Sequence, residues 1–328
     1  MKALIYQGTE QTAIEDWPDP VPGPGEVLID LAHCGICGSD MHAWHGHDAR
    51  RVPPMILGHE AVGTLVSGPR AGTRVAINPL ITCGTCRACR SGHRHLCGER
   101  NLLGMGYPGA YAERIVVKDS QITALKDGTD FATAALAEPL ACGVHGIKLA
   151  LPHLRQARSE TDVVILGGGA IGLLAALVFA EFGFATIRIA EVNAARRNML
   201  ADCLTAMPYD PITTPAPDAS ADLVFDAVGS GRTRAAASAM IRPGGTIIHI
   251  GLQDSAPGID TRRITLQEVA FIGTYCYSDA DFAEALDLLE SGRITGAGWA
   301  EIRPLADGPR SFVDIDQGRA PPKIILEI

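Results

Sequence analysis

The 328-residue sequence lacks several features that would assign it to whole classes of protein. It has no apolar run near the ~20 residues needed to span a bilayer, which argues against a membrane-spanning protein. Its first residues lack the apolar core and the cleavage site of a secretory signal, so we expect a cytoplasmic protein. It also has no excess of positive charge. The formal net charge is -9, which argues against nucleic acid or an anionic membrane as a partner.

The sequence has no internal repeat, and a prior of about 150 residues per domain predicts roughly two domains. With 47% hydrophobic and 20% charged residues, it has the composition of a globular protein with buried cores. Cysteine, in contrast, is abundant and clustered. Six of the nine cysteines lie between Cys34 and Cys97, and in a cytoplasmic chain this indicates metal or redox chemistry rather than disulfides.

The pattern of expected elements changes near residue 141. Before it, short apolar strands alternate with glycine and proline turns, as at residues 26–31, 72–77 and 109–117. After it, strands alternate with helices, which predicts a parallel, doubly wound sheet. We expect the strands of this part at residues 163–166, 185–190, 223–228, 246–250 and 269–272, a helix at 170–182, and a helix at 281–291 before a short strand at 323–326.

A glycine-rich segment follows the first strand of the second part. Gly167, Gly169 and Gly172 fit the pattern G-x-G-x-x-G, which is informative here because a strand precedes it and a helix follows it. Gly167 permits the tight turn, Gly169 lets the backbone approach a pyrophosphate, and Gly172 lets the helix pack on the strand. The helix N-terminus, with Ala170 and Ile171 in its first turn, then faces negative charge. This predicts a dinucleotide site; a turn that serves packing alone is the alternative.

Glu191 ends the second strand of this part, 19 residues after Gly172. A carboxylate at this position binds the ribose hydroxyls and repels a 2′-phosphate, which favours NAD over NADP. Arg196 and Arg197 follow closely, and arginines can accommodate a phosphate, so NADP stays open as the alternative cofactor.

Cys83, Cys86, Cys89 and Cys97 form the pattern C-x2-C-x2-C-x7-C. Four thiolates on a short loop match a closed tetrahedral zinc site with no position for substrate. The alternative is an iron–sulfur cluster, but its bacterial pattern has a last gap of three residues followed by proline. Here the last gap is seven residues and Gly98 follows, so we expect a structural zinc ion.

A second group of zinc-binding residue types precedes this loop. The segment 34–42 contains Cys34, Cys37 and His42, and the segment 58–60 contains a histidine followed by a glutamate. A catalytic zinc needs about three protein ligands and one open position. One cysteine, one histidine and one carboxylate would supply these ligands.

These segments, the four-cysteine loop and the glycine pattern, taken in this order, resemble the zinc-dependent medium-chain alcohol dehydrogenases. The similarity is greatest to the sorbitol, threonine and butanediol dehydrogenase branch, and it covers nearly the whole chain. It implies a GroES-like, β-rich catalytic domain made of residues 1–141 and 280–328. It also implies a Rossmann dinucleotide-binding domain made of residues 142–279, so that the fold class is α/β.

By this resemblance the catalytic zinc is bound by Cys37, rather than by Cys34, and by His59. Glu60 and Glu138 are the implied carboxylates, and the resemblance leaves open which of them ligates directly. Glu138 stands where another main branch of the family has cysteine, which favours the polyol-type branch. Together with the four-cysteine loop, the resemblance implies two zinc ions per chain.

The resemblance further implies that Ser39 and His42 form a proton relay through the cofactor ribose, with His42 as the general base. The unperturbed pKa of histidine, near ~6.5, suits that role, and an ordinary loop histidine is the alternative. Cys142 is implied to lie beside the nicotinamide, and a role as a zinc ligand is the alternative. The complete set of implied cofactor contacts is Cys142, Gly167, Gly169, Ala170, Ile171, Gly172, Glu191, Arg196, Val228, Gly251 and Tyr275.

The sequence departs from the family pattern in two places. Sorbitol dehydrogenases usually carry an aromatic residue and an arginine where this sequence has Ala43 and Thr274, so sorbitol itself is not specified. The stretch between Arg197 and Asp222 is short, and its prolines predict that one helix and one strand of the sheet are missing there.

The sequence therefore predicts a zinc-dependent oxidoreductase that transfers hydride between NAD(H) and a secondary alcohol or its ketone. The substrate is expected to be a polyol, a sugar alcohol or a related small hydroxy compound. A threonine dehydrogenase-like enzyme and a broad-specificity alcohol dehydrogenase are the alternatives within the family. A zinc-free reductase is disfavoured by the full ligand set, and a non-catalytic, crystallin-like dinucleotide-binding protein is the alternative from another class. We expect a homo-oligomer, either a tetramer or a dimer.

Overall fold

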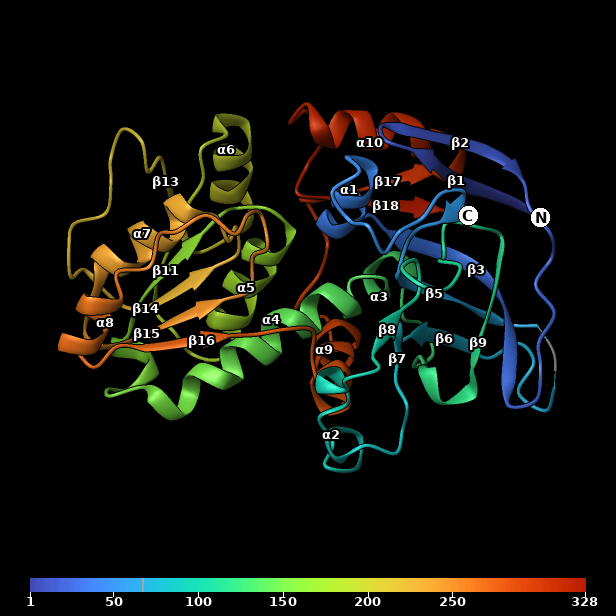
Figure 1. Cartoon of the computed structure of the whole chain (residues 1–328), viewed down its shortest axis with the longest axis horizontal. Helices are drawn as coiled ribbons and strands as arrows, with labels where there is room; N and C mark the ends of the chain where they lie inside the picture. The colour runs from blue at the N-terminus through green and yellow to red at the C-terminus, as the bar shows by residue number, and fades with distance from the viewer. Residues whose placement is uncertain (67) are drawn as a thin grey trace. The chain divides into compact units, whose positions relative to one another are not determined.

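Residues 1–66 and 68–328 are described by the structure, a computed structural model, and they divide into two units (Figure 1). Unit 1 comprises Met1–Pro139, Ser278–Gly296 and Ala300–Ile328. Unit 2 comprises Leu140–Tyr277 and Ala297–Trp299. Within the two described ranges, every helix is too short or too polar to cross a membrane.

Unit 1 is built around the strand β3 (Glu26–Gly35), which pairs antiparallel with three others. Ile29 and Leu31 lie two residues apart on one face of β3, and both are buried in the core of the unit. The sheet has the order β10-β6-β5-β3-β18-β17 with β9 also paired to β3, and a smaller sheet has the order β2-β1-β4. The other elements are β1 (Lys2–Gly8), β2 (Gln11–Asp16), α1 (Gly38–Trp44), β4 (Met55–Ile56), β5 (Glu60–Leu65), β6 (Arg74–Ile77), β7 (Leu80–Ile81), α2 (Arg87–Arg90), β8 (Asn101–Leu102), β9 (Arg114–Lys118), β10 (Ile122–Ala124), α3 (Phe131–Ala134), α9 (Asp279–Glu290), β17 (Ala300–Pro304), α10 (Gly308–Asp316) and β18 (Lys323–Glu327).

Unit 2 contains a parallel sheet with the strand order β13-β12-β11-β14-β15-β16. Its two central strands are almost entirely buried and mostly apolar, as expected for strands that are covered on both faces. The elements are α4 (Ala137–Ala150), β11 (Asp162–Leu166), α5 (Ala170–Glu181), β12 (Thr186–Ala190), α6 (Ala194–Cys203), β13 (Met207–Tyr209), β14 (Ala221–Asp226), α7 (Gly231–Met240), β15 (Ile241–His249), α8 (Thr261–Leu266) and β16 (Ala270–Gly273).

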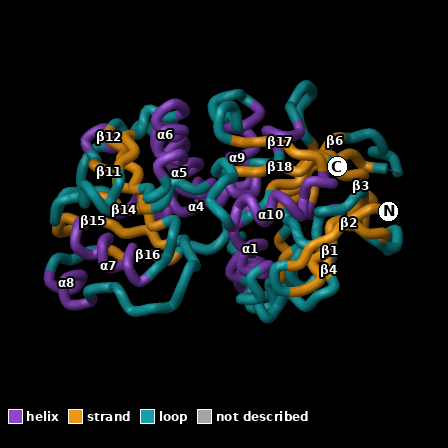
Figure 2. The backbone as a smooth tube through the Cα atoms, turned by 90° about the horizontal axis from the view of Figure 1, so that it is seen from above, coloured by secondary structure: helices purple, strands orange, loops and turns teal. Residues whose placement is uncertain are grey.

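The strand order reverses at β11, from which the chain first proceeds to β12 and later returns to β14. Right-handed crossovers therefore place the helices before and after this reversal on opposite faces of the sheet. Figure 2 shows α5 and α6 on one side and α7 on the other. The predicted doubly wound parallel sheet is thus confirmed, and its reversal point is where such sheets bind ligands.

The prediction that both a helix and a strand are missing between Arg197 and Asp222 is wrong for the strand. β13 pairs in parallel with β12, with Pro208 opposite Ile189. Because β13 is the edge strand, the missing N–H of Pro208 removes no bond from the ladder. The helix is indeed absent from residues 210–220, all of which the structure describes.

Candidate active site

Three of the residues expected at the catalytic zinc lie together in unit 1. Cys37 follows β3 and is the N-cap of α1, while His59 directly precedes β5, which begins at Glu60. Because β3 and β5 pair antiparallel with Gly35 opposite Glu60, both segments reach the same end of the sheet. One ligand atom from each of Cys37, His59 and Glu60 lies within 4.8 Å of the others. We call this group the three-residue cluster.

The three-residue cluster fits a divalent cation. His59 and Glu60 are 3% and 1% exposed. Burial acts to lower the pKa of His59, but the negative charges of Asp40 and Cys37 outweigh it and raise this pKa to about 10. Among the described residues, Oε1 of Glu60 has no hydrogen-bond partner. An excess of buried negative charge and an unsatisfied carboxylate oxygen are both relieved by a bound zinc ion.

Asp40 supports the histidine of this cluster. Its Oδ1 lies 3.6 Å from Nδ1 of His59, and its Oδ2 accepts hydrogen bonds from the Tyr111 hydroxyl at 2.7 Å and the Cys37 amide at 3.2 Å. At 3.6 Å the contact with His59 is electrostatic rather than a hydrogen bond, and it favours a protonated Nδ1 facing the carboxylate. The sequence prediction did not assign a role to Asp40 or to Tyr111, although Asp40 lies within the cysteine segment that it used.

Lys323 forms a buried ion pair with Glu60. Its ammonium also donates to the carbonyl of Ile36 at 2.8 Å. Burial acts to lower the pKa of Lys323, but the charges of Glu60 and Cys37 raise it overall, so the lysine stays charged. The sequence prediction missed Lys323, for which the available signal was a charged residue at the start of an otherwise apolar strand.

We expect Lys323→Met to destabilise the protein by about 3 kcal/mol, because it leaves the carboxylate of Glu60 buried without its partner. The matched control is Lys126→Met. Lys126 pairs with Asp287 and Glu290, but its side chain is 63% exposed, so its loss should change stability little. Urea unfolding of the two variants and the wild type measures the difference, and equal stability losses in both variants would contradict the expectation.

Glu138 and Cys34 lie outside the three-residue cluster. Glu138 is in the first turn of α4, and its charge acts on both His59 and Lys323. Cys34 is fully buried, where its thiol contacts the carbonyl of Gly35 at 3.8 Å. Burial raises the pKa of Cys34 well above its usual value, which keeps the thiol neutral. The geometry therefore places Cys37, and not Cys34, beside His59.

Ser39 and His42 lie three residues apart on α1, a spacing that makes residues neighbours on a helix surface. Oγ of Ser39 accepts a hydrogen bond from Nη2 of Arg51 at 3.1 Å. Burial, followed by the nearby His47 and His45, lowers the pKa of His42 below its usual 6.5. The imidazole of His42 is therefore neutral at pH 7 and able to accept a proton. The relay itself stays a prediction.

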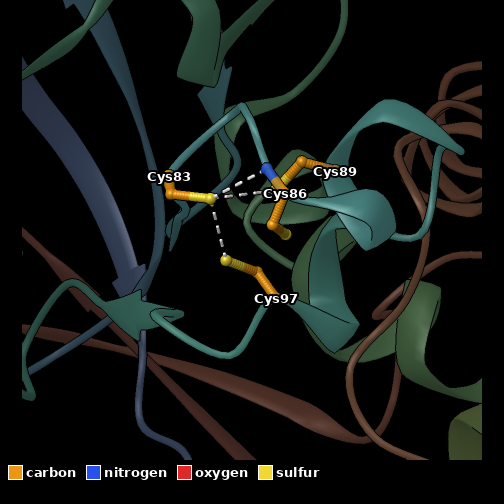
Figure 3. A group of neighbouring side chains, drawn as sticks. All are labelled: Cys83, Cys86, Cys89 and Cys97. Atoms are coloured by element: carbon orange, nitrogen blue, oxygen red, sulfur yellow. Dashed lines mark hydrogen bonds between the residues drawn. The ribbon is translucent and has the colours of Figure 1, made fainter.

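The four cysteines of the loop 83–97 form a separate cluster (Figure 3). Sγ of Cys83 lies 3.5 Å from Sγ of Cys97 and 3.9 Å from Sγ of Cys89, and it accepts from the amide of Cys86 at 3.3 Å. Hydrogen bonds from the Thr85 and Cys86 amides lower the pKa of Cys83 to about 6. All four sulfur atoms lie within 4.8 Å of one another, which fits a tetrahedral zinc ion with four thiolate ligands.

The glycine segment of unit 2 fits a pyrophosphate. Gly167 has a φ of +96°, and a Cβ on Gly172 would lie 1.9 Å from the carbonyl oxygen of Gly167, so both positions require glycine. Gly169 is the N-cap of α5, and a Cβ added there meets no atom within 4 Å among the described residues. The first amides of α5, including those of Ala170 and Ile171, are thus accessible to an anionic group.

The carboxylate of Glu191 is fixed beside this segment. It is 5% exposed and accepts hydrogen bonds from the amides of Gly168 at 3.0 Å and Asn193 at 2.8 Å. Arg196 lies 3.4 Å from the same carboxylate, whereas Arg197 donates to the carbonyl of Glu191 at 2.8 Å. Both arginines thus contact Glu191.

Val228 and Gly251 meet where β14 and β15 end. A Cβ on Gly251 would lie 2.1 Å from the carbonyl carbon of Val228, and a Cβ on Gly167 would lie 2.6 Å from Cγ2 of Val228. Cys142 lies on α4 and Tyr275 follows β16, and both are half-buried residues of unit 2. The structure thus brings Val228 and Gly251 to the glycine segment, at the edge where parallel sheets bind cofactors.

Two family models match the sequence of this chain, one in each part. Residues 23–127 match the alcohol dehydrogenase GroES-like domain, and residues 170–291 match the zinc-binding dehydrogenase family. The chain belongs to the zinc-binding alcohol dehydrogenase family. The predicted fold class, a GroES-like domain with a Rossmann domain, is confirmed, and the protein is an oxidoreductase.

Individual relatives of this dehydrogenase match it over its whole length. The 2-dehydro-3-deoxy-L-galactonate 5-dehydrogenase of Pseudoalteromonas atlantica is 31% identical, with 100% of this chain and 98% of that protein covered. The L-threonine 3-dehydrogenase of Streptomyces avermitilis is also 31% identical, with 100% and 99% covered. Among solved structures, the acetophenone reductase of Geotrichum candidum in complex with NAD has 25% identity and a TM-score of 0.88, covering 100% of this chain and 97% of that one. Other structures with this fold contain NADP or NADH.

Proposed function

We propose that this dehydrogenase interconverts a secondary alcohol of a polyol, a sugar acid or a related small hydroxy compound and the corresponding ketone, with NAD as the hydride acceptor. The observation that carries the proposal is the three-residue cluster of Cys37, His59 and Glu60, held by Asp40 in a buried, negatively charged setting. The substrate class is supported by relatives named for their action on galactonate derivatives and xylulose.

The proposal assigns separate tasks to the two units and the two metal sites. Unit 1, corresponding to the expected domain of residues 1–141 and 280–328, would hold both zinc ions. One ion would be bound by Cys37, His59 and a glutamate, which is Glu60 or Glu138, and the other by the four-cysteine cluster. Unit 2, corresponding to residues 142–279, would bind NAD through the glycine segment. The carboxylate of Glu191 would repel the 2′-phosphate of NADP and so favour NAD. On the resemblance alone, we further propose a cytoplasmic homo-oligomer, either a tetramer or a dimer.

Cys37, His59 and a glutamate would hold a zinc ion that would supply Lewis-acid polarisation of the alcohol oxygen, and the glycine segment would hold the nicotinamide cofactor that would supply a hydride acceptor. The residues of this chain transfer the hydroxyl proton of the substrate and position the groups that take part. Ser39 receives that proton on Oγ while its own proton leaves, and His42, which is neutral at pH 7, holds the outgoing proton until it reaches water. Asp40, whose other oxygen accepts a hydrogen bond from Tyr111, keeps a negative charge beside His59. One hydride and one proton thus leave the alcohol for each ketone formed.

We expect His42→Asn to lower kcat for alcohol oxidation at neutral pH by about 100-fold and to remove the acid limb of the kcat–pH profile. The pKa of His42 lies below 6.5, so the wild type is fully active at neutral pH and loses activity as the pH falls through that lowered pKa. Asparagine cannot titrate there, so its profile should stay flat on the acid side. The control is His45→Asn, because His45 pairs with Asp316 at 3.1 Å and has no proposed part in the relay. An acid limb that persists in His42→Asn would contradict the role.

The substrate proposal is tested by offering the zinc-loaded protein polyols, sugar acids and L-threonine with either NAD or NADP. We expect reduction of NAD with a polyol or a sugar acid, and slower reduction of NADP. Fastest turnover with L-threonine would favour the threonine dehydrogenase alternative, and similar rates with simple secondary alcohols would favour a broad-specificity enzyme. Binding of NAD without turnover of any compound would overturn the enzymatic proposal.

A further inference from the structure

Arg51 is a buried cation that the mechanism above does not use. Its side chain is 1% exposed and follows α1 in the sequence. Nε donates to the carbonyl of Gly104 at 2.8 Å, and Nη1 donates to Oδ2 of Asp48 at 2.7 Å. Burying a guanidinium is costly unless its N–H donors are paired. Because Arg51 is almost closed to water, its remaining donors need acceptors within the protein.

Two of the three remaining donors of Arg51 point to Ser39. Nη1 donates to the main-chain carbonyl of Ser39 at 3.2 Å, and Nη2 donates to its Oγ at 3.1 Å. One planar guanidinium therefore holds both the backbone and the hydroxyl of Ser39, and the fixed fork geometry of arginine suits it to this task. The negative charge that balances Arg51 comes from Asp48 and from Asp40, whose Oδ1 lies 3.8 Å from Nη2.

This contact restricts the direction of the Ser39 hydroxyl. A serine oxygen has two lone pairs and one hydrogen, and a guanidinium has no acceptor. Arg51 fills one lone pair, so the hydroxyl hydrogen cannot point toward it. The second lone pair stays available for an incoming proton while the O–H donates elsewhere. Without Arg51, the hydroxyl would rotate among several directions, and only some of them would suit proton transfer.

We propose that Arg51 is a positioning residue that orients the Ser39 hydroxyl for transfer of the substrate proton. The inference rests on the proposed relay through Ser39. The charge of Arg51 also reaches the other relay residue, since it adds to burial, His47 and His45 in lowering the pKa of His42. A purely structural clamp that holds the segment around Asp48 is the competing explanation, and the two differ in whether Arg51 acts through the hydroxyl.

The test is a double-mutant cycle with Arg51→Lys and Ser39→Ala in the zinc-loaded protein. Lysine keeps the charge but lacks the fork, so we expect Arg51→Lys to lower kcat by about tenfold with KM changed by less than about threefold. The solvent deuterium isotope effect on kcat should increase, because proton transfer becomes slower. In the Ser39→Ala background, the same substitution should change kcat by less than about twofold, since the group it acts through is gone.

The matched control is Arg50→Met. Arg50 pairs with Asp48, the same carboxylate that binds Arg51, but its side chain is 64% exposed. We expect it to leave kcat and the isotope effect unchanged. Zinc content and the thermal unfolding midpoint are measured for every variant. If Arg51→Lys does not fold, Asp48→Asn serves instead, because it loosens Arg51 from the opposite side and should give a smaller loss with the same dependence on Ser39.

The outcomes separate this inference from the proposed function. A loss of kcat on Arg51→Lys that is equal in the Ser39 and Ser39→Ala backgrounds would overturn the positioning role and leave the clamp. An unchanged kcat in Arg51→Lys, with a clear loss in Ser39→Ala, would also overturn it while keeping the relay. A full kcat in Ser39→Ala would show instead that the proposed relay is wrong.

Discussion

Cys37→Ala is expected to lower kcat by at least about a thousandfold and to reduce the zinc content from two ions per chain to one. The thiolate is one of three groups in the cluster, and a bound metal ion contributes several kcal/mol to stabilising charge in the transition state. Because Cys37 is also the N-cap of α1, which carries Ser39 and His42, its loss disturbs the proposed relay as well. Steady-state kinetics and metal analysis on the same preparation measure both effects.

The control for this prediction lies three residues earlier in the chain. Cys34 has the same side chain, but it is fully buried, carries a neutral thiol and lies outside the three-residue cluster. Cys34→Ala should keep two zinc ions and most of the turnover, with only a modest loss of stability. If Cys37→Ala kept full turnover, or if Cys34→Ala lost the same zinc ion, the assignment of the catalytic cluster would be wrong.

Cys97→Ser is expected to have its largest effect on stability. It removes one of the four sulfur ligands from a closed site, and structural zinc contributes directly to the free energy of folding. We expect loss of one zinc ion and destabilisation on the order of 5 kcal/mol, because the loop that carries these ligands has few buried apolar side chains of its own. The remaining folded protein should retain the zinc ion of the other cluster.

A cysteine outside both clusters provides the comparison. Cys203 lies at the end of α6 in unit 2 and is half-buried, so Cys203→Ser should leave the zinc content at two and change stability much less. Urea unfolding with metal analysis of both variants measures this. A Cys97→Ser variant with two zinc ions and an unchanged unfolding midpoint would show that the loop does not hold zinc.

The features that could be predicted from the sequence are those with short-range causes. Gly167 and Gly172 are required by a turn and by a backbone contact within six residues, so their spacing alone indicated the segment. The cysteine loop is equally local. The parallel sheet could be predicted because its strands are apolar on both faces. β13 could not, because Pro208 argues against a strand unless the strand is known to be at the edge of a sheet.

The residues that were missed act across long distances in the sequence. Lys323 reaches Glu60 because β18 and β5 both pair with β3, and no local pattern reveals this pairing. Arg51 looks like one of two adjacent surface arginines until the fold places it against Ser39 and Gly104. The sequence could therefore predict which groups are expected to contact zinc and cofactor, whereas the groups that support them became visible only in the fold.

The most direct test of the central claim follows a deuterium label. A secondary alcohol found in the substrate screen is labelled at its carbinol carbon and offered with NAD to protein that has been stripped of metal, and to the same protein after zinc is restored. We predict that the label appears in the reduced nicotinamide only after zinc is restored, as expected when the cluster of Cys37 and His59 holds the metal that activates the alcohol. Equal transfer of the label by the stripped protein would contradict zinc-dependent hydride transfer.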